Sequence, residues 1–293
     1  MIKIAIIGLG YWGKKLLKEF NEICDVCYCC TKGNKENIKW LKNHYPKIKY
    51  ISTFDDLIKQ NNLQAVVIAT PINTHYLLVK KSLEAGKHVF VEKTMTQNLI
   101  QAKTILDIAK KKKKMLFVGH IFLYHPILRQ IKKIIQKDPI TYIHCTWTKL
   151  GTFNENLVLD FVSHFLSILN ELLGMPNEII ILESKGFTTK CDLIILEVKY
   201  QDNIKGIIEI NRLSNYKKRT ISISTRKNLF LWDDDTLLKF NRKKLSFEQI
   251  LESKNTALAL ECIEFINLIK AKSKDYSNIA KGLKVLSIIE KLM

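Results

Sequence analysis

The apolar positions in the first part of the chain come in short, nearly continuous runs. Residues 4–7, 65–70 and 88–91 contain almost only apolar side chains, which is typical of strands buried on both faces of a parallel sheet. Segments with helical periodicity separate these runs. The expected strands are residues 4–7, 24–30, 49–52, 65–70, 88–91 and 115–118, and the expected helices are residues 14–22, 36–45, 54–60, 76–85 and 96–113. This alternation predicts a doubly wound α/β domain over residues 1–121.

The pattern changes near Ile121, where apolar and polar positions begin to alternate along longer segments. Residues 141–148, 193–200, 204–213 and 219–225 show this alternation, which indicates a mostly antiparallel, open sheet that is covered on one face. Helices are expected over residues 156–173, 248–271 and 278–292. The second half therefore predicts an α+β domain over residues 122–293, with a role in substrate binding and oligomerisation.

Three spaced glycines follow the first apolar run. Gly8, Gly10 and Gly13 fit the pattern G-x-G-x-x-G, with Tyr11 and Trp12 inside it. One glycine makes the turn, one lets a pyrophosphate approach the backbone, and one allows close helix packing. The phosphate would lie at the helix N-terminus, where free N–H groups favour anions. Directly after a buried strand, this favours a dinucleotide-binding Rossmann domain over a purely structural glycine turn.

The end of the second expected strand bears on the choice of cofactor. An acidic residue there would bind the ribose 2′-hydroxyl of NAD, whereas a cationic or hydroxyl side chain accepts the 2′-phosphate of NADP. The chain has Thr31 and Lys32 at this place and no carboxylate. We therefore expect an NAD(P) cofactor and favour NADP, the alternative being that Lys32 is solvated and selects nothing.

Polar residues follow two further strands at the edge where open α/β sheets bind their ligands. We expect the following residues to contact the cofactor there: Thr70, Pro71, Asn73 and His75 after one strand, and Glu92 and Lys93 after the next. His120, Tyr124 and His125 follow the last strand of the sheet and are candidates for substrate binding, the alternative for each being an ordinary packed or capping residue.

Asp160 and His164 lie four residues apart in an expected helix, which places both on one face. A carboxylate in this position can orient an imidazole, and histidine exchanges protons near neutral pH. Alone, the pair is more typical of a surface or helix-stabilising role than of catalysis. Oxidation of an alcohol by hydride loss needs a base and a cation near the developing oxyanion, and His164 and Lys93 are candidates for these roles.

The chain has 293 residues and a formal net charge of +19, which raises nucleic-acid binding as a hypothesis. Lysines are spread along the whole sequence, however, and the dense run at residues 110–114 ends an expected helix. Lysines in such a place are solvated and interact favourably with the helix dipole. We therefore expect no nucleic-acid partner. We expect the positive charge to help in capturing an anionic cofactor and substrate.

The seven cysteines follow no disulfide pattern, and reduced thiols are expected. Cys24, Cys27, Cys29 and Cys30 fall in the second expected strand, so we interpret them as small core residues and expect no metal site. No apolar run approaches the roughly 18 residues that indicate a membrane span. A cytoplasmic protein without a membrane partner is expected.

Five segments, in this order, resemble the glucose-fructose oxidoreductase and inositol dehydrogenase family (Gfo/Idh/MocA). They are Gly8-Leu-Gly-Tyr-Trp-Gly13, Ala69-Thr-Pro-Ile-Asn-Thr-His75, Glu84-Ala-Gly-Lys-His-Val-Phe-Val-Glu-Lys93, Gly119-His120 and Asp160-x-x-x-His164. In that family the Glu-Lys pair lies beside the nicotinamide, the lysine acts at the substrate hydroxyl, and the histidine of Asp-x-x-x-His is the acid/base. The resemblance implies these catalytic roles for Lys93, Asp160 and His164.

Residues 10–13, 74–76 and 119–126 look closer to the family's sugar-nucleotide branch, which includes UDP-N-acetylglucosaminuronate 3-dehydrogenase. The resemblance thus implies hydride transfer between nicotinamide and a secondary hydroxyl or keto carbon of a sugar, in particular a nucleotide-linked sugar. Three positions depart from the family pattern: Thr94 replaces a usual proline, His125 a common asparagine, and Phe165 a frequent aspartate.

Two other functions stay open on the same fold. One is reduction of another small carbonyl substrate, and the other is non-catalytic dinucleotide binding or sensing. Because an open sheet face is usually covered by another subunit, we also expect a homodimer or homotetramer formed through the C-terminal sheet.

Overall fold

The computed structural model describes residues 1–151, 153, 156–253 and 256–293, and these described residues form two compact units. Unit 1 contains residues 1–121 and 258–290, and unit 2 contains residues 122–257 and 291–293. Residues 258–290 therefore pack with the first 121 residues, although they were expected in the second domain. The assignment of dinucleotide binding to residues 1–121 and of substrate binding to residues 122–293 stays a prediction.

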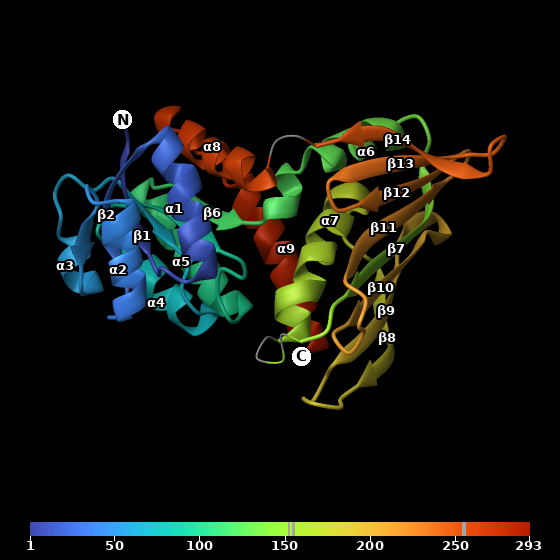
Figure 1. The fold of residues 1–293 in the computed structure, drawn as a ribbon, viewed down its shortest axis with the longest axis horizontal. Helices are drawn as coiled ribbons and strands as arrows, with labels where there is room; N and C mark the ends of the chain where they lie inside the picture. Colours follow the sequence, from blue (N-terminus) through green and yellow to red (C-terminus); the bar gives the residue numbers. More distant parts are fainter. Residues whose placement is uncertain (152, 154–155, 254–255) are drawn as a thin grey trace. The chain divides into compact units, whose positions relative to one another are not determined.

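Within its described residues, unit 1 has one parallel sheet of six strands in the order β3-β2-β1-β4-β5-β6, with helices against both faces (Figure 1). The strands are β1 Lys3–Ile7, β2 Asp25–Cys30, β3 Lys49–Ile51, β4 Ala65–Ile68, β5 His88–Glu92 and β6 Leu116–Gly119. The helices between them are α1 Tyr11–Ile23, α2 Lys35–His44, α3 Phe54–Ile58, α4 Ile72–Glu84 and α5 Leu99–Lys112. This strand order confirms the expected doubly wound sheet. Apolar strands of this kind require cover on both faces, which the helices provide.

Two helices from the end of the chain complete unit 1, namely α8 Ala257–Lys270 and α9 Ser277–Leu292. The ring of Phe265 in α8 packs on Phe20, Phe90 and Phe117, with centroid distances of 5.6 to 6.1 Å. The side chain of Asn278 in α9 accepts a hydrogen bond from the Val118 N–H and donates one to the Val118 carbonyl. This amide thereby satisfies main-chain groups on the outer edge of β6 that would otherwise be buried without a partner.

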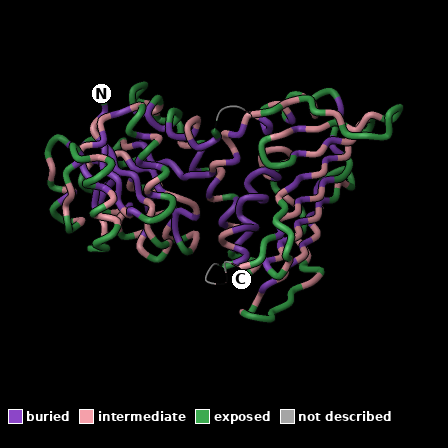
Figure 2. The backbone as a smooth tube through the Cα atoms, viewed as in Figure 1, coloured by how far each residue is buried: buried purple, intermediate pink, exposed green. Residues whose placement is uncertain are grey.

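Among the described residues of unit 2, eight strands form one sheet in the order β14-β13-β12-β11-β7-β10-β9-β8. The strands are β7 Ile140–Thr148, β8 Glu178–Lys185, β9 Leu193–Lys199, β10 Lys205–Asn211, β11 Lys218–Thr225, β12 Leu229–Asp233, β13 Thr236–Asn241 and β14 Ser246–Glu252. All described pairs are antiparallel except β7 with β10. Buried and less buried positions alternate along β9 and β10 (Figure 2), so the expected mostly antiparallel sheet is confirmed.

The helices of unit 2 include α6 Pro126–Ile135 and α7 Ser163–Leu173, which cover one face of this sheet (Figure 1). The expected single helix over residues 156–173 is interrupted, because Val158–Val162 form a π-helical turn before α7 begins. π-helical turns inside helices are rare and frequently occur at functional sites.

The expected helix over residues 248–271 is wrong in its first part. Residues 246–252 form β14, which pairs with β13, and the helix begins at Ala257; residues 254–255 lie outside the described residues. Glu248, Gln249 and Glu252 are good helix formers, but pairing with a neighbouring strand overrides that preference. The strands β8, β12 and β13 and the helix α6 had not been expected.

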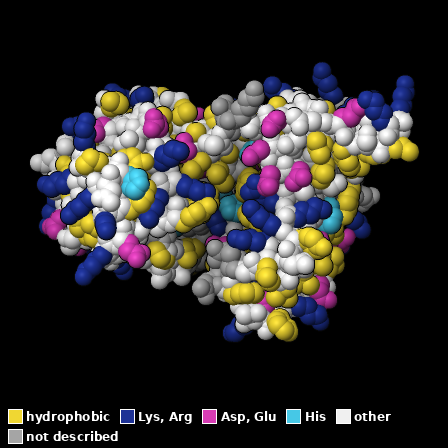
Figure 3. All heavy atoms as spheres, viewed as in Figure 1, with side chains coloured by type: hydrophobic (Ala, Val, Ile, Leu, Met, Phe, Trp, Pro, Cys, Tyr) yellow, Lys and Arg dark blue, Asp and Glu magenta, His cyan; other side chains and the backbone are white. Residues whose placement is uncertain are grey.

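On the face of the molecule that Figure 3 draws, the basic residues are dispersed. Figure 3 shows Lys and Arg side chains spread over the visible face of each unit, interspersed with acidic and apolar side chains. The run at residues 110–114 lies at the C-terminal end of α5 and is largely exposed, as expected for solvated lysines. In the part of the chain that the structure describes, no helix has the length and apolar character needed to cross a membrane.

Candidate functional site

The three glycines after β1 differ in what a side chain at each position would meet. A Cβ on Gly8, whose φ is +90°, would lie 2.4 Å from the Ala69 carbonyl oxygen, and a Cβ on Gly13 would lie 1.9 Å from the Gly8 oxygen. A Cβ on Gly10 would meet no atom within 4 Å. Gly8 therefore makes the turn, Gly13 allows the close approach of α1, and Gly10 leaves open space beside the backbone.

The N-terminus of α1 directly follows this open space. Its N-cap residue is Gly10, which has no side chain to bond the free N–H groups of the first turn. Such N–H groups, together with the helix dipole, favour a phosphate. The geometry therefore fits a dinucleotide pyrophosphate, with Gly10 and the first turn of α1 as the residues that would hold it.

Tyr11 and Trp12 begin α1, and both side chains are exposed. The ammonium of Lys15 lies 4.4 Å from the ring centroid of Tyr11 and 4.9 Å from that of Trp12, within the range of a cation–π interaction. The contact of these two rings with the cofactor stays a prediction.

A basic pocket of about 500 Å³ lies between α1 and α2. Its lining residues are Gly10, Tyr11, Lys14, Lys15, Lys18, Asn37, Trp40 and Tyr45. At the end of the adjacent strand β2, Thr31 is half-buried and Lys32 is exposed. Sequence reasoning considered Thr31 and Lys32 but missed Lys14 and Lys18, although their spacing of four residues indicates one helix face.

The residues after β4 form the start of α4 rather than a loop. Pro71 is the N-cap of α4 and Asn73 lies exposed in its first turn, while the Thr70 and Thr74 hydroxyls are 2.7 Å apart. His75 is buried, with Nε2 2.8 Å from the Thr70 carbonyl oxygen and Nδ1 2.9 Å from the Thr94 carbonyl oxygen. Burial lowers the pKa of His75. This imidazole thus connects the end of β4 to the segment that follows β5.

Glu92 ends β5 and Lys93 follows it, at the carboxyl edge of the sheet. The Lys93 N–H donates to Glu92 Oε2 over 3.3 Å, and the Lys93–Thr94 peptide bond is cis. Burial raises the pKa of the Glu92 carboxyl to about 7, although the charge of Lys93 acts in the opposite direction. Near neutral pH this carboxyl is therefore partly protonated beside an ammonium group.

His120 joins the same edge, because β5 and β6 pair Glu92 with Gly119. Its side chain is buried, and in the described part of the chain Nδ1 has no hydrogen-bond partner. The pKa of His120 is lowered to about 4, chiefly by burial and also by the charges of Lys93 and Lys281. The structure thus brings Glu92, Lys93 and a neutral His120 together within unit 1.

In unit 2, the Asp160 carboxylate accepts a hydrogen bond of 2.9 Å from the Asn156 N–H at the start of the π-helical turn. His164 follows in the first turn of α7 and is 8% exposed. Its ring stacks on Trp147 with centroids 5.7 Å apart and meets Phe122 edge-on at 5.1 Å. Packing against two aromatic rings therefore fixes the orientation of this imidazole.

His125 is the N-cap of α6 and is also buried. Its Nδ1 accepts a hydrogen bond from the Ile127 N–H over 3.3 Å, which leaves Nε2 to donate to Asp235, 3.2 Å away. Burial lowers the pKa of His125, and Asp235 opposes that effect. The neighbouring Tyr124 is half-buried. The substrate-binding roles of His120, Tyr124 and His125 stay predictions.

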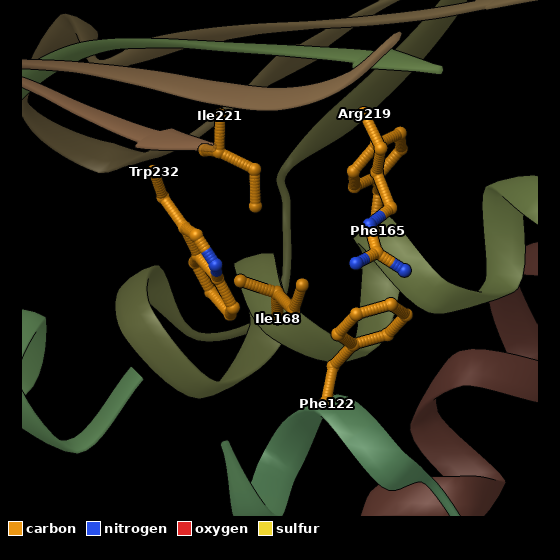
Figure 4. A pocket seen from close by; sticks show the side chains of 6 residues that line it. All are labelled: Phe122, Phe165, Ile168, Arg219, Ile221 and Trp232. Atoms are coloured by element: carbon orange, nitrogen blue, oxygen red, sulfur yellow. The ribbon is translucent and has the colours of Figure 1, made fainter. Parts of the chain in front are cut away.

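Arg219 is a residue near His164 that sequence reasoning missed. Its guanidinium lies 4.8 Å from the Phe122 ring centroid and 5.5 Å from that of Trp147, and Figure 4 shows it above the Phe122 ring. Arg219 lies opposite Trp147 in the β11–β7 ladder. This pairing depends on strand register across 72 residues of sequence, so a local pattern could not reveal it.

Five of the seven cysteines are buried, and Cys27 and Cys191 are half-buried. All seven are free, and burial raises the pKa of Cys24 and Cys29 to about 12. A high thiol pKa opposes formation of the thiolate that binds metals. Among the described residues, no group of three or more His, Cys, Asp or Glu side chains is arranged to hold a metal ion.

Residues 2–120 match a family model described as oxidoreductase family, NAD-binding Rossmann fold (GFO_IDH_MocA). An uncharacterised oxidoreductase of Schizosaccharomyces pombe is 42% identical over 149 residues, which cover 46% of this chain and 40% of that protein. Across five curated relatives, this one included, the chain spans 40% to 62% of their length.

Other similarities extend over nearly the whole chain at lower identity. UDP-N-acetylglucosamine 3-dehydrogenase of Acidithiobacillus ferrooxidans is 22% identical over 302 residues, covering 98% of this chain and 94% of that protein. Its solved structure aligns with a TM-score of 0.89 over 99% and 96% of the two chains at 20% identity. A variant of KijD10, a 3-ketoreductase from Actinomadura kijaniata solved with TDP-benzene and NADP, aligns with a TM-score of 0.87 over 99% and 96% at 15% identity. These structural likenesses confirm the fold.

Proposed function

We propose that the protein is an NAD(P)-dependent dehydrogenase or reductase of a sugar, because residues 2–120 match the model of the Gfo/Idh/MocA oxidoreductase family. The proposed reaction exchanges a hydride at a secondary hydroxyl or keto carbon, in particular carbon 3 of a nucleotide-linked sugar. The observation that carries the proposal is the glycine loop, in which Gly10 leaves open space next to the uncapped start of α1. The similarity to a UDP-N-acetylglucosamine 3-dehydrogenase over 98% of the chain supports the choice of substrate.

The bound nicotinamide would supply the hydride acceptor or donor. Lys93 donates a hydrogen bond to the reacting oxygen and stabilises its developing negative charge. His164 takes the hydroxyl proton during oxidation and returns it during reduction, and Asp160 orients it. His120 is neutral and Glu92 partly protonated at neutral pH, so Lys93 is the positively charged member of these three side chains.

NADP is the proposed cofactor rather than NAD. Thr31 and Lys32 provide a hydroxyl and a cation at the end of β2, where a carboxylate would favour NAD. The lysines that line the pocket between α1 and α2 add positive charge beside this position. The presence of NADP in the solved KijD10 variant supports the same choice.

Two measurements test the proposal. Tryptophan fluorescence titrations with NADPH and NADH report cofactor binding, and we expect NADPH to bind more tightly. A panel of UDP-linked and free sugars, followed at 340 nm, then reports turnover. Failure of both cofactors to bind would contradict the proposal, and NADPH binding without turnover of any sugar would leave a dinucleotide-binding protein with a different role.

Variants test the proposed catalytic residues. Lys93→Ala and His164→Ala should each lower kcat at least about 100-fold, in the range known for general acid/base and electrostatic catalysis. Matched controls are Lys111→Ala, which removes an exposed lysine of α5, and His144→Ala, which removes a half-buried histidine of β7. Retained activity in either catalytic variant would refute the mechanism.

We also propose a homodimer or homotetramer formed through the sheet of unit 2. Apolar side chains on its strands are exposed, among them Tyr142, Ile181, Phe247 and Ile250. Exposed apolar groups of this size are typical of association surfaces. Light scattering coupled to gel filtration would measure the mass, and a monomer at micromolar concentration would contradict the proposal.

A further inference from the structure

Two aromatic side chains of unit 2 each contact both a histidine and an arginine. The Phe122 ring lies 5.1 Å from the His164 ring and 4.8 Å from the Arg219 guanidinium. The Trp147 ring lies 5.7 Å from His164 and 5.5 Å from Arg219. The imidazole proposed to exchange the substrate proton and the guanidinium therefore share one aromatic support.

This support orients the guanidinium without using up its hydrogen-bond donors. Arginine stacks on aromatic faces through its plane, and its N–H groups point outward in that plane, where they match a carboxylate or phosphate. Arg219 Nη2 contacts Asp234 Oδ1 at 2.7 Å. The Arg219 side chain is 30% exposed and that of Asp234 is 61% exposed. Exposed pairs of this kind are weak, so a substrate anion can compete with Asp234.

The approach to Arg219 is from its exposed side. The cavity between Arg219, Phe122, Phe165 and Trp232 is about 10 Å³, roughly the space of one water molecule. Figure 4 shows that the side chains lining this cavity besides Arg219 are apolar. The apolar environment on the buried side of the guanidinium excludes water there and strengthens an electrostatic contact on the exposed side.

We propose that Arg219 forms an anion-binding subsite, which holds a carboxylate or phosphate group of the sugar substrate while His164 exchanges the proton of its hydroxyl. This proposal rests on the proposed function and narrows its substrate class to acidic sugars, namely sugar carboxylates and sugar phosphates, including nucleotide diphosphate sugars. A purely structural role would instead have Arg219 hold β11 to the turn that carries Asp234.

Ligand titrations of the full chain, followed by tryptophan fluorescence, test the proposal directly. Trp147 contacts Arg219 and Trp232 lines the same cavity, so both report on this region. The probes are glucose, glucuronate, glucose 6-phosphate, UDP-N-acetylglucosamine and UDP-N-acetylglucosaminuronate. Glucuronate against glucose isolates the carboxylate, and glucose 6-phosphate against glucose isolates the phosphate.

Three variants are compared with the parent. In Arg219→Met, affinity for the recognised anionic sugars should fall about 10- to 100-fold, the range for a lost charge-assisted hydrogen bond, whereas affinity for glucose should change less than about 3-fold. Arg226→Met removes an exposed arginine beyond the end of β11 and should change neither affinity. Asp234→Asn removes the competing carboxylate and should keep or raise the affinity for anions.

Several results would overturn the proposal. The proposal fails if the parent protein binds neutral and anionic sugars with equal affinity. It also fails if Arg219→Met lowers the affinity for both kinds of sugar equally. If Asp234→Asn reproduced the defect of Arg219→Met, the ion pair would be structural. The same experiments distinguish failure of the proposed function from failure of the subsite. If anions bind in an Arg219-dependent manner but no sugar is turned over with NADPH, the proposed oxidoreductase function is refuted. If sugars are turned over equally well by the parent and by Arg219→Met, the anion-binding subsite is refuted.

Discussion

Replacing Glu261 by glutamine is expected to stabilise the protein increasingly as the pH rises. Glu261 lies in α8 of unit 1 and is 1% exposed, and its Oε1 has no hydrogen-bond partner among the described residues. Burial raises the pKa of this carboxyl well above its ordinary value, and the charge of Glu92 raises it further. The folded protein therefore keeps a proton on Glu261 under conditions in which the unfolded chain releases it.

The sign and size of the effect follow from this difference in proton binding. A carboxyl whose pKa is raised on folding contributes its full stability below the unfolded pKa of about 4.3 and loses it as the pH rises. Each retained proton lowers the free energy of unfolding by about 1.4 kcal/mol per pH unit. Because of Glu261, the free energy of unfolding of the parent should thus fall by about 2.7 kcal/mol between pH 5 and pH 7. Glu92 makes a similar contribution to the fall of the free energy of unfolding with pH, which ends near its pKa of about 7.

Urea denaturation at pH 5, 6, 7 and 8, followed by far-ultraviolet circular dichroism, measures the free energy of unfolding. The difference between Glu261→Gln and the parent should grow by about 1.4 kcal/mol per pH unit, because other groups titrate in both proteins and cancel. Glu264→Gln changes an exposed glutamate of the same helix and should leave the slope unchanged. Parallel curves for Glu261→Gln and the parent would show that Glu261 ionises normally and would refute the reasoning.

Other variants test the glycine loop and the packing of unit 1. Gly13→Ala should yield insoluble or strongly destabilised protein in an expression and melting assay, because its Cβ would lie 1.9 Å from the Gly8 oxygen; a normal Tm would contradict this. Gly10→Ala should keep the parent Tm but weaken NADPH binding at least about 10-fold in a fluorescence titration. His75→Ala should lower the free energy of unfolding in urea by about 1–3 kcal/mol, because a hydrogen bond to a buried carbonyl group is lost. Phe265→Ala should lower it by about 3–5 kcal/mol, and a smaller loss would show that α8 contributes little to the core.

The parallel sheet of unit 1 could be predicted because its signals are local. The strands at residues 4–7 and 88–91 are continuous apolar runs, and the spacing of Gly8, Gly10 and Gly13 specifies one turn geometry. The carboxyl-edge rule then predicted that Glu92 and Lys93 lie at the same edge of the sheet as Thr70 and Pro71. These inferences needed no knowledge of contacts between distant parts of the chain.

The features that escaped prediction depend on contacts far apart in the sequence. Phe265 packs on Phe20 and Phe90, and the apolar pattern of α8 does not say which core it joins. Residues 248–252 have helix-forming side chains, but pairing of β14 with β13 decides their structure. The position of Arg219 beside Trp147 likewise follows from strand register, which one sequence does not specify.

The departure at Thr94 has a structural counterpart in unit 1. The segment that carries Lys93 is fixed before it by the β5–β6 ladder, which pairs Glu92 with Gly119, and after it by His75, whose Nδ1 lies 2.9 Å from the Thr94 carbonyl oxygen. Because the pKa of His75 is lowered by burial, its imidazole is neutral at neutral pH and donates from one nitrogen only. The proton therefore lies either on the Thr70 side or on the Thr94 side, and placing it on Nδ1 holds the backbone just beyond Lys93. In that tautomer, a side chain of α4 restrains a position at which the family that the sequence resembles more often has the rigid ring of proline.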